Sequence, residues 1–410
     1  MKIAFILGCF PVVSETFIIR QITGLIDLGH KVDIYALSKG DGIVHPEIKE
    51  YDLLTRTQYF NIPQNKVHRA LKLVPYVIES IFRKPKVILE AKNTWRDYHS
   101  TILKFYMLKP FLTHKYDVIH CHFGPTGKIF LFLKAVFPKS RYVVTFYGYD
   151  FSAWVKACGM NIYKNLFEKS DCVIAVSDYM AHRLLKLRCP SSKVVRLYIG
   201  LDLQDFPYRD RTLKSDETIK LLTVARLVEK KGLEYSIKAV AQLAKKYPRL
   251  IYKIVGEGPL RSQLENLIRE LGVKDKVFLL GAQNSVIVRQ LIDEAHLFVL
   301  ASITAKDGDQ EGLPVVLQEA QAQGLPVVAT LHDGLPESVL NGKSGFLVPE
   351  RDVNALTEKL EYLIEHPEIW PEMGHEGRKL VETHFDIKKL SIQLVRIYEK
   401  LLKTIDPTSF

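Results

Sequence analysis

Residues 311–319 read EGLPVVLQE, which places two glutamates eight positions apart around a glycine, a proline and an apolar run. The preceding segment LFVLAS (297–302) is typical of a buried strand. LPVVLQEAQAQ (313–323) is typical of a helix, and Gly324 directly after it is a common helix terminator. The stretch is therefore predicted to form a strand, a polar loop and a helix.

The two glutamates would lie at different levels of this helix. Glu311 falls in the loop at the helix N-terminus, Pro314 suits the first turn, and Glu319 lies about 12 Å further along. That distance exceeds the roughly 5–9.5 Å between the carboxylates of a glycosidase pair. It suits two groups that grip opposite ends of an extended ligand, with the N–H groups of Gly312 and Leu313 facing an anionic middle.

Strand-like and helical segments alternate along nearly the whole chain, which predicts parallel sheets covered by helices on both faces. The strands expected in the first half are 2–7, 31–37, 116–123, 141–148, 171–177 and 193–200, and those in the second half are 219–225, 251–256, 276–281, 297–302, 325–330 and 345–349.

The alternation pauses at 201–218, a polar segment without periodicity. We expect two Rossmann-like, doubly wound domains, 1–200 and 219–385, joined by this linker and facing each other across a cleft. A final helix within 386–410 has no strand after it and is expected to pack back on the first domain.

The length and composition suit two domains of ordinary size. The chain has 410 residues, 47% of them hydrophobic, and no run of about 18 uncharged apolar residues that would predict a transmembrane helix. Its start, MKIAFILGCFPVVSETF, reads as a first buried strand and not as a signal peptide. The 5 cysteines are widely spaced, which predicts reduced thiols in the cytoplasm, without a disulfide framework or a zinc site.

Charge is unevenly distributed. Residues 1–200 hold 29 Lys and Arg against 15 Asp and Glu, whereas the remainder holds 28 against 31. Within 66–115 the count is 11 to 3, with aromatic residues interleaved. This segment is either a solvated helical face or a basic amphipathic surface for anionic lipid. Nucleic acid is a weaker option because no recognition motif accompanies the charge, and no nucleic-acid partner is expected.

Two cations could neutralise an anionic ligand. VARLVEKKG places Arg226 just after a strand and Lys231 at the start of the next helix, and together they could clamp a diphosphate. Taken alone, the pair also fits a solvated helix start. GEGPL, with Gly256 and Gly258, is a turn whose backbone could approach a nucleotide, although any tight connection uses glycine.

Taken in this order in successive βα units, these elements resemble the carboxy-terminal half of glycosyltransferase family four, retaining enzymes of the GT-B fold. VVATLHDGLPESVLNGKSGFLV resembles the segment that follows in those enzymes. The resemblance implies that Arg226 and Lys231 neutralise the donor diphosphate. It assigns the transferred sugar to Glu311 with the neighbouring backbone of Gly312, Leu313 and Pro314, the ribose to Glu319, and the donor site also to Gly256 and Gly258.

The first half resembles a subgroup that builds bacterial exopolysaccharides, including the colanic-acid type, through FPVVSETFI, HCHFGPTG and TFYGYD. The resemblance implies that His122 reaches the donor sugar and the reacting centre. His120 is expected to face away from it. The resemblance does not extend to residues 40–115.

Two departures from the family concern the first domain. Its first loop reads GCFPVVSET where many relatives have a glycine pair, so Ser14 and Thr16 are candidate donors and Ser14 is also a candidate helix cap. Tyr147 stands where histidine is common. With Glu15, these residues are assigned to the acceptor or donor-sugar side.

Two competing motifs carry less weight. DGD (307–309) matches an Asp-x-Asp cation site but precedes a helix in the wrong architecture. With Arg226, Lys231 and a helix N-terminus present, we expect no metal and no cofactor. No Gly-x-Ser-x-Gly elbow supports a hydrolase.

The sequence therefore predicts a retaining, metal-independent glycosyltransferase that moves a hexose from a nucleotide sugar, UDP-glucose as the best guess. The acceptor would be a polysaccharide or a polyprenyl-linked oligosaccharide at the cytoplasmic face of a membrane, with peripheral contact to anionic lipid. A nucleotide-sugar epimerase or a non-catalytic nucleotide-sugar-binding protein of the same fold is the alternative.

Overall fold

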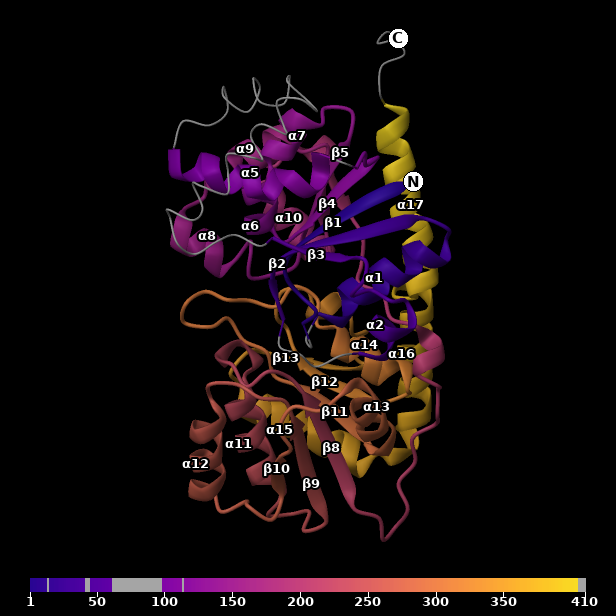
Figure 1. Cartoon of the computed structure of the whole chain (residues 1–410). Helices are drawn as coiled ribbons and strands as arrows, with labels where there is room; N and C mark the ends of the chain where they lie inside the picture. The colour runs from indigo at the N-terminus through magenta and orange to yellow at the C-terminus, as the bar shows by residue number, and fades with distance from the viewer. Residues whose placement is uncertain (13–14, 41–44, 61–97, 113, 405–410) are drawn as a thin grey trace.

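The computed structural model describes residues 1–12, 15–40, 45–60, 98–112 and 114–404. Two α/β domains lie one above the other, and the chain passes from the upper, indigo and magenta domain to the lower, orange one (Figure 1). Each domain contains one parallel sheet with helices against it. The prediction of two doubly wound domains is confirmed.

The first sheet has the order β3-β2-β1-β4-β5-β6-β7, with every neighbouring pair parallel. Its central strands are buried on both faces, as runs such as IAFIL and VIHCH require. The strands are β1 Lys2–Phe10, β2 Lys31–Lys39, β3 Thr57–Tyr59, β4 Val118–His122, β5 Arg141–Phe146, β6 Cys172–Ala175 and β7 Val194–Arg196, and the helical segments are α1 Thr16–Asp27, α2 Pro46–Glu50, α5 Tyr98–Leu112, α6 Gly124–Phe130, α7 Phe132–Val136, α8 Ala153–Cys158, α9 Lys164–Lys169, α10 Asp178–Lys186, η1 Ser191–Lys193 and η2 Leu203–Asp205.

The second sheet repeats the arrangement as β10-β9-β8-β11-β12-β13, again with parallel neighbours. In each sheet the strand order reverses between two central strands, β1 and β4 or β8 and β11, and ligands of doubly wound sheets bind beyond such points. The strands are β8 Ile219–Val224, β9 Leu250–Val255, β10 Val277–Leu279, β11 Leu297–Leu300, β12 Val327–Thr330 and β13 Gly345–Val348, and the helical segments are η3 Glu229–Lys231, α11 Leu233–Leu243, α12 Arg261–Glu270, α13 Ser285–Glu294, α14 Val315–Ala322, η4 Leu335–Glu337, α15 Val353–Glu365, η5 Pro367–Ile369, α16 Trp370–His384 and α17 Ile387–Lys403.

The last helix returns to the first domain. In Figure 1, α17 runs up the flank of the upper domain beside α1. Its Leu390, Leu394 and Tyr398 belong to the same buried cluster as the apolar face of α1. The helix therefore ties the end of the chain to the domain in which it begins.

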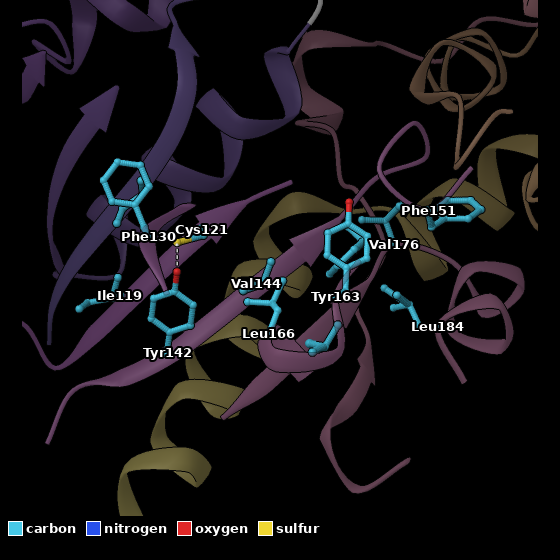
Figure 2. Packing of buried hydrophobic residues seen from close by; sticks show 14 of the residues in the cluster. Ile119, Cys121, Phe130, Tyr142, Val144, Phe151, Tyr163, Leu166, Val176 and Leu184 are labelled. Atoms are coloured by element: carbon cyan, nitrogen blue, oxygen red, sulfur yellow. Dashed lines mark hydrogen bonds between the residues drawn. The ribbon is translucent and has the colours of Figure 1, made fainter. Parts of the chain in front are cut away.

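The other face of the first sheet packs on a second apolar cluster, part of which Figure 2 shows. Phe130, Val144, Tyr163 and Leu166 are buried there with almost no exposed surface. The one polar contact drawn in the figure is the Cys121 thiol, 3.1 Å from the Tyr142 hydroxyl. This core fixes the carboxyl ends of β4 and β5, from which candidate site residues project.

Several smaller expectations can be compared with the structure. The N-terminal segment is a buried strand, β1, as expected. The edge strand β3 was not predicted, because its three residues give no periodic signal. The 5 cysteines, all within the described residues, are free thiols. No helix in the described ranges is long and apolar enough to cross a membrane.

Candidate functional site

The candidate site lies where β8 and β11 end side by side in the second sheet. Arg226 follows β8, and the loop that leads from β11 to α14 carries Glu311. Because parallel strands end at the same edge, residues 85 positions apart in the chain meet here by topology. The fold thus brings together the two central parts of the predicted donor site.

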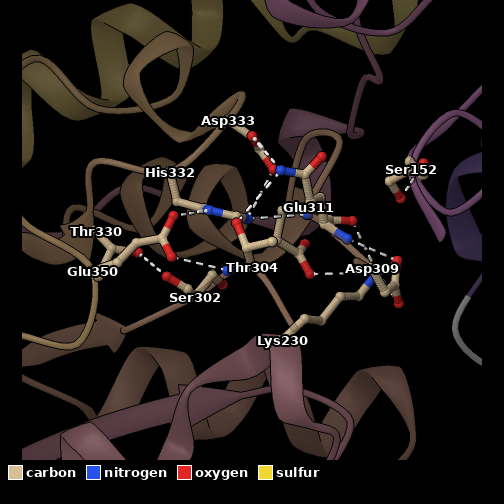
Figure 3. Close-up of polar contacts among 12 residues, drawn as sticks. Ser152, Lys230, Ser302, Thr304, Asp309, Glu311, Thr330, His332, Asp333 and Glu350 are labelled. Carbon is tan, nitrogen blue, oxygen red and sulfur yellow. Dashed lines mark hydrogen bonds and ion pairs between the residues drawn. The ribbon is translucent and has the colours of Figure 1, made fainter. Parts of the chain in front are cut away.

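A buried carboxylate paired with lysines forms the centre of the site, and Figure 3 shows it with one of them, Lys230. Glu311 is 5% exposed, and its Oε1 lies 2.9 Å from Lys231 Nζ and 3.8 Å from Lys230 Nζ. Burial would raise the pKa of Glu311, but the two lysines outweigh it and lower that pKa to about 2. Glu311 is therefore a carboxylate at neutral pH and is held as one.

Burial has the opposite effect on a lysine, because it lowers the pKa of a base. Burial is the main cause that lowers the pKa of Lys231, and the charges of Lys230 and Arg226 act in the same direction against the pull of Glu311. Arg226 itself is exposed, so its guanidinium is available to a ligand. The predicted Arg226–Lys231 clamp therefore has one cation engaged with Glu311 and one facing solvent.

The helix begins two residues later than the sequence indicated. Pro314 occupies the N-cap position with extended backbone, and α14 starts at Val315. Proline fits there because this position needs no helical φ/ψ and its lost N–H has no helical partner. Gly324 ends the helix with a positive φ of 83°, as expected. Leu313 is buried, 5% exposed.

The first domain meets the site at Gly312. A Cβ on Gly312 would lie 1.7 Å from the carbonyl oxygen of Tyr147, so only glycine permits this approach. The predicted donor site is thus closed on one side by the loop after β5. Gly312 serves close packing between domains here, in addition to any contact it makes with a ligand.

Glu319 faces the first domain as well. Its Oε1 lies 3.1 Å from Nη2 of Arg20, which comes from α1, and both side chains are largely buried. Arg20 also lies over the ring of Phe206, in the linker. Glu319, the residue predicted to bind the ribose, is thus paired across the two domains.

The glycine turn packs against the segment that carries Arg226. A Cβ on Gly256, whose φ is +139°, would lie 2.0 Å from Ala225 O, and a Cβ on Gly258 would lie 2.5 Å from Leu227 O. Both glycines are therefore needed to bring this turn against the end of β8. Their contact with a nucleotide stays a prediction.

His122 ends β4 and is fully buried. Its Nδ1 lies 2.6 Å from the Tyr147 hydroxyl, and within the described part of the chain its Nε2 has no hydrogen-bond partner. Burial first, and then the neighbouring His120, lower the pKa of His122 well below its usual range, so it is neutral. Burial is also the main cause that raises the pKa of Tyr147.

The expectation that His120 faces away is wrong. The rings of His120 and His122 stack with centroids 4.4 Å apart, because residues two apart in a strand share a face. His120 is satisfied on both nitrogens, at 2.6 Å from the Tyr398 hydroxyl and 2.7 Å from Thr145 Oγ1. It therefore packs against the ring of His122 while bonded to Tyr398 and Thr145.

The first-loop candidates are only partly described. Ser14 lies outside the described residues. The N-cap position of α1 is Glu15, one residue after the cap we expected, and it makes no side-chain capping bond, while Thr16 is the first helical residue. Their assignment to the acceptor or donor-sugar side stays a prediction.

The DGD motif lies beside the lysine cluster. Asp309 is 3.1 Å from Lys230 Nζ, and Asp307 accepts a hydrogen bond from the backbone of Asp309. Over the described ranges no group of three or more His, Cys, Asp or Glu is arranged to hold a metal ion. The carboxylate of Asp309 is thus neutralised by a lysine.

Sequence reasoning missed three residues of this region. Lys230 was passed over beside Lys231, although the doubled lysine in EKKG was a usable signal. Arg20 gave no local signal, since its partner Glu319 is 299 positions away. Glu337, which accepts hydrogen bonds at 2.7 and 2.8 Å from the backbone of Asp178 and Tyr179, joins the domains at a further point.

Two family profiles together match most of the chain. Residues 14–205 match the profile described as Glycosyltransferase Family 4, and residues 205–380 match that described as Glycosyl transferases group 1. The two matches meet inside the linker that we placed at 201–218.

Relatives match over the full length. A glycosyltransferase of Escherichia coli K12 named for colanic acid biosynthesis is 35% identical, with 98% of this chain and 100% of the relative covered. The amylovoran biosynthesis glycosyltransferase of Erwinia amylovora is 32% identical over 98% of this chain and 100% of that protein.

Solved structures show the same architecture. HepE of Anabaena, solved with UDP, is 19% identical, has a TM-score of 0.71, and is covered to 100% by 98% of this chain. The sucrose-phosphate synthase of Thermosynechococcus elongatus is 20% identical with a TM-score of 0.74, over 98% of this chain and 99% of that one. At this identity the likeness concerns the fold, which is GT-B.

Proposed function

This chain belongs to the glycosyltransferase family 4 of group 1 transferases, and from that membership we propose that it transfers a hexose from a nucleotide sugar to a polysaccharide or lipid-linked oligosaccharide. The observation that carries the proposal is the buried Glu311–Lys231 pair at the N-terminus of α14, with exposed Arg226 beside it. It offers cations for a diphosphate and a fixed carboxylate for sugar hydroxyls.

The donor we propose is UDP-glucose. HepE of Anabaena has been solved with UDP-glucose as well as with UDP. Exopolysaccharide synthesis as the setting is supported by the colanic acid and amylovoran relatives. In this assignment Glu319 binds the ribose, and the backbone near Gly312 and Leu313 faces the sugar.

We propose transfer with retention of configuration. The bond from the sugar C1 to the diphosphate breaks, the bond from C1 to the acceptor oxygen forms on the same face, and a donor phosphate oxygen takes the acceptor proton. Glu311 is a poor candidate for a nucleophile, because its charge is engaged by Lys231 at 2.9 Å. Arg226 and Lys231 would stabilise the leaving diphosphate, which needs no metal ion in this scheme.

The donor and the stereochemistry can be tested together without knowing the acceptor. The protein is incubated with UDP-glucose, and slow donor hydrolysis is followed by proton NMR. We expect α-glucose to appear before mutarotation, and a loss of product in Arg226→Ala, which removes an exposed cation and leaves the fold intact. Initial β-glucose would overturn retention, and an epimerised UDP-sugar would favour the epimerase.

A thermal-shift panel of nucleotide sugars, run in parallel, ranks the donors because a bound ligand stabilises the folded state. Donor hydrolysis measured in the presence of EDTA tests metal independence. Activity abolished by EDTA and restored by Mn²⁺ would assign Asp307 and Asp309 to a metal site after all.

A further inference from the structure

His332 lies two residues after β12 at the centre of a buried polar network (Figure 3). It is 2% exposed. Its Nδ1 lies 2.6 Å from Glu350 Oε1, and its Nε2 lies 3.3 Å from the backbone N of Glu311. The imidazole thus contacts the main chain of the residue assigned to the transferred sugar.

The network holds the loop that carries Glu311 at both ends. Glu350, which His332 contacts, accepts a hydrogen bond from the backbone N of Thr304 at 2.9 Å. Gln310, next to Glu311, donates to Asp333 Oδ1 at 3.3 Å. Residues 304–311 are therefore anchored near their start through Glu350 and at their end directly by His332.

Two neighbours of Nε2 require opposite proton states. The Glu311 N–H is a donor, so it needs the lone pair of a neutral imidazole. Asp333 Oδ2 lies 2.9 Å from the same nitrogen, but among the described residues this buried oxygen has no hydrogen-bond partner. A proton on Nε2 would bond Asp333 and leave the Glu311 N–H without its acceptor.

We propose that His332 is a positioning residue, which holds the Glu311 loop in its sugar-binding arrangement only while its imidazole is neutral. The proposal rests on the proposed function, in which Glu311 contacts the donor sugar. It adds a group that touches no reacting atom and yet makes donor-sugar binding depend on pH.

The charges around His332 favour its protonation within an accessible pH range. It faces the carboxylates of Asp333 and Glu350, and Arg351 pairs with Glu350 at 2.9 Å. On the side of Glu311, the cations are Lys230 and Lys231. Burial lowers the pKa of His332, but Asp333 and Glu350 outweigh it and raise that pKa above its usual 6.5. The neutral imidazole therefore accumulates only as the pH rises past the raised pKa of His332.

The first test compares two ligands in the wild-type protein. Affinity for UDP-glucose should fall about 3- to 10-fold as the pH drops through the titration of His332, the size expected for one neutral hydrogen bond. Affinity for UDP, which lacks the sugar, should follow only the titration of its own terminal phosphate at about pH 6 and should do so equally in wild type and His332→Gln. A pH dependence that His332→Gln changes equally for both ligands would overturn the proposal.

Two variants separate titration from a structural role. His332→Gln keeps an acceptor for the Glu311 N–H and cannot ionise, so its UDP-glucose affinity should be flat with pH. Asp333→Asn removes a carboxylate that favours the imidazolium, so the transition should move to lower pH. A wild-type profile in either variant contradicts the proposal.

A last readout does not depend on the donor. In transverse-relaxation-optimised NMR spectra, the Glu311 amide should shift with the same midpoint as the His332 ring, and His332→Gln should abolish the shift. If UDP-glucose fails to bind but the two titrations coincide, the proposed donor is wrong and the coupling stands. If the Glu311 amide ignores the His332 titration, the coupling is refuted whatever the donor is.

Discussion

At the scale of single residues, the candidate site is a set of buried charges that neutralise one another. Glu311 is enclosed with Lys230 and Lys231, and Asp309 is paired with Lys230. Removing one member of such a group leaves its partner charged, buried and unpaired, which costs far more than an exposed pair would. The sequence indicated Glu311 and Lys231 separately, and only their contact shows that each depends on the other.

The first prediction concerns Glu311→Gln. At pH 7 the variant leaves Lys231 unpaired, so the free energy of unfolding should fall by about 3–5 kcal/mol. The lowered pKa of about 2 means that the stabilisation by Glu311 is complete above the unfolded value of 4.5 and is lost as the pH falls toward 2. The difference in free energy of unfolding between wild type and variant, measured by urea unfolding, should therefore shrink as the pH falls from 5 to 3.

An exposed carboxylate provides the control. Glu365 pairs with Lys246 at 2.6 Å on the surface, so Glu365→Gln should leave the free energy of unfolding almost unchanged at pH 7. A gap for Glu311→Gln that stays constant with pH would show that its ionisation is not what stabilises the fold.

The second prediction concerns Glu319. If it binds the ribose, Glu319→Gln should weaken UDP binding by about 1–3 kcal/mol, the range of a charged hydrogen bond. Gln is chosen over Ala because it keeps a side-chain acceptor near Arg20. Uridine lacks the diphosphate but has the ribose, so its affinity should fall by the same factor in titration calorimetry. A loss seen with UDP but not with uridine would place Glu319 at the phosphates instead.

At the scale of elements, a helix end makes one of the contacts between the domains. The N-terminus of α10 in the first domain is capped internally by Ser177 Oγ, which accepts from Met180 N at 3.1 Å. It also receives the carboxylate of Glu337 from η4 of the second domain. A carboxylate at a helix N-terminus is stabilised by the free N–H groups and the helix dipole. The carboxylate of Glu337 thus bonds the second domain to the N-terminus of a helix in the first.

The third prediction separates these two caps. Glu337→Ala should lower stability by about 1–3 kcal/mol, because two backbone donors lose a charged acceptor. Ser177→Ala should cost about 1 kcal/mol. Only Glu337→Ala should also increase proteolysis at the linker, since only it weakens a contact between domains. Equal proteolysis in both variants would show that Glu337 is a local cap without influence on the interface.

At the scale of the whole molecule, contacts from several elements join two sheets that share a doubly wound strand order, the first with one additional edge strand. The loop after β5 reaches Gly312, α1 reaches Glu319, and α10 reaches Glu337. The long α17 returns to α1 and holds the first domain beside the second. Residues of the predicted donor site are therefore in contact with the first domain.

The fourth prediction belongs to this scale. The basic segment 66–115 lies mostly outside the described residues, and within it the structure describes only α5 and residues 114–115. A membrane contact therefore stays a prediction. In vesicle co-sedimentation, the protein should pellet with anionic liposomes at low salt. It should be released above roughly 0.5 M salt, where the Debye length is only a few ångströms.

Neutral liposomes serve as the control for that experiment. Binding that is equal with neutral and anionic vesicles, or absent from both at low salt, would mean that the basic segment is a solvated face. The proposal of a lipid-linked acceptor would then rest on the relatives alone.

The sequence by itself determined the alternation of strands and helices, the position of α14 and the choice of Glu311, Arg226 and Lys231 as candidates. These features follow from local periodicity, glycine and proline positions and motif order, which need no knowledge of distant contacts. It failed for β3, which is too short for a periodic signal, and for His120, where strand phase was misjudged.

Only the tertiary structure decided which charges meet. The pairing of Glu319 with Arg20, the meeting of Gly312 with Tyr147, and the enclosure of His332 by Asp333 and Glu350 join segments far apart in the chain or depend on burial. Burial sets whether a carboxylate or an imidazole is charged, and burial is a property of the folded domains together. A single sequence records the groups, and the fold determines their partners.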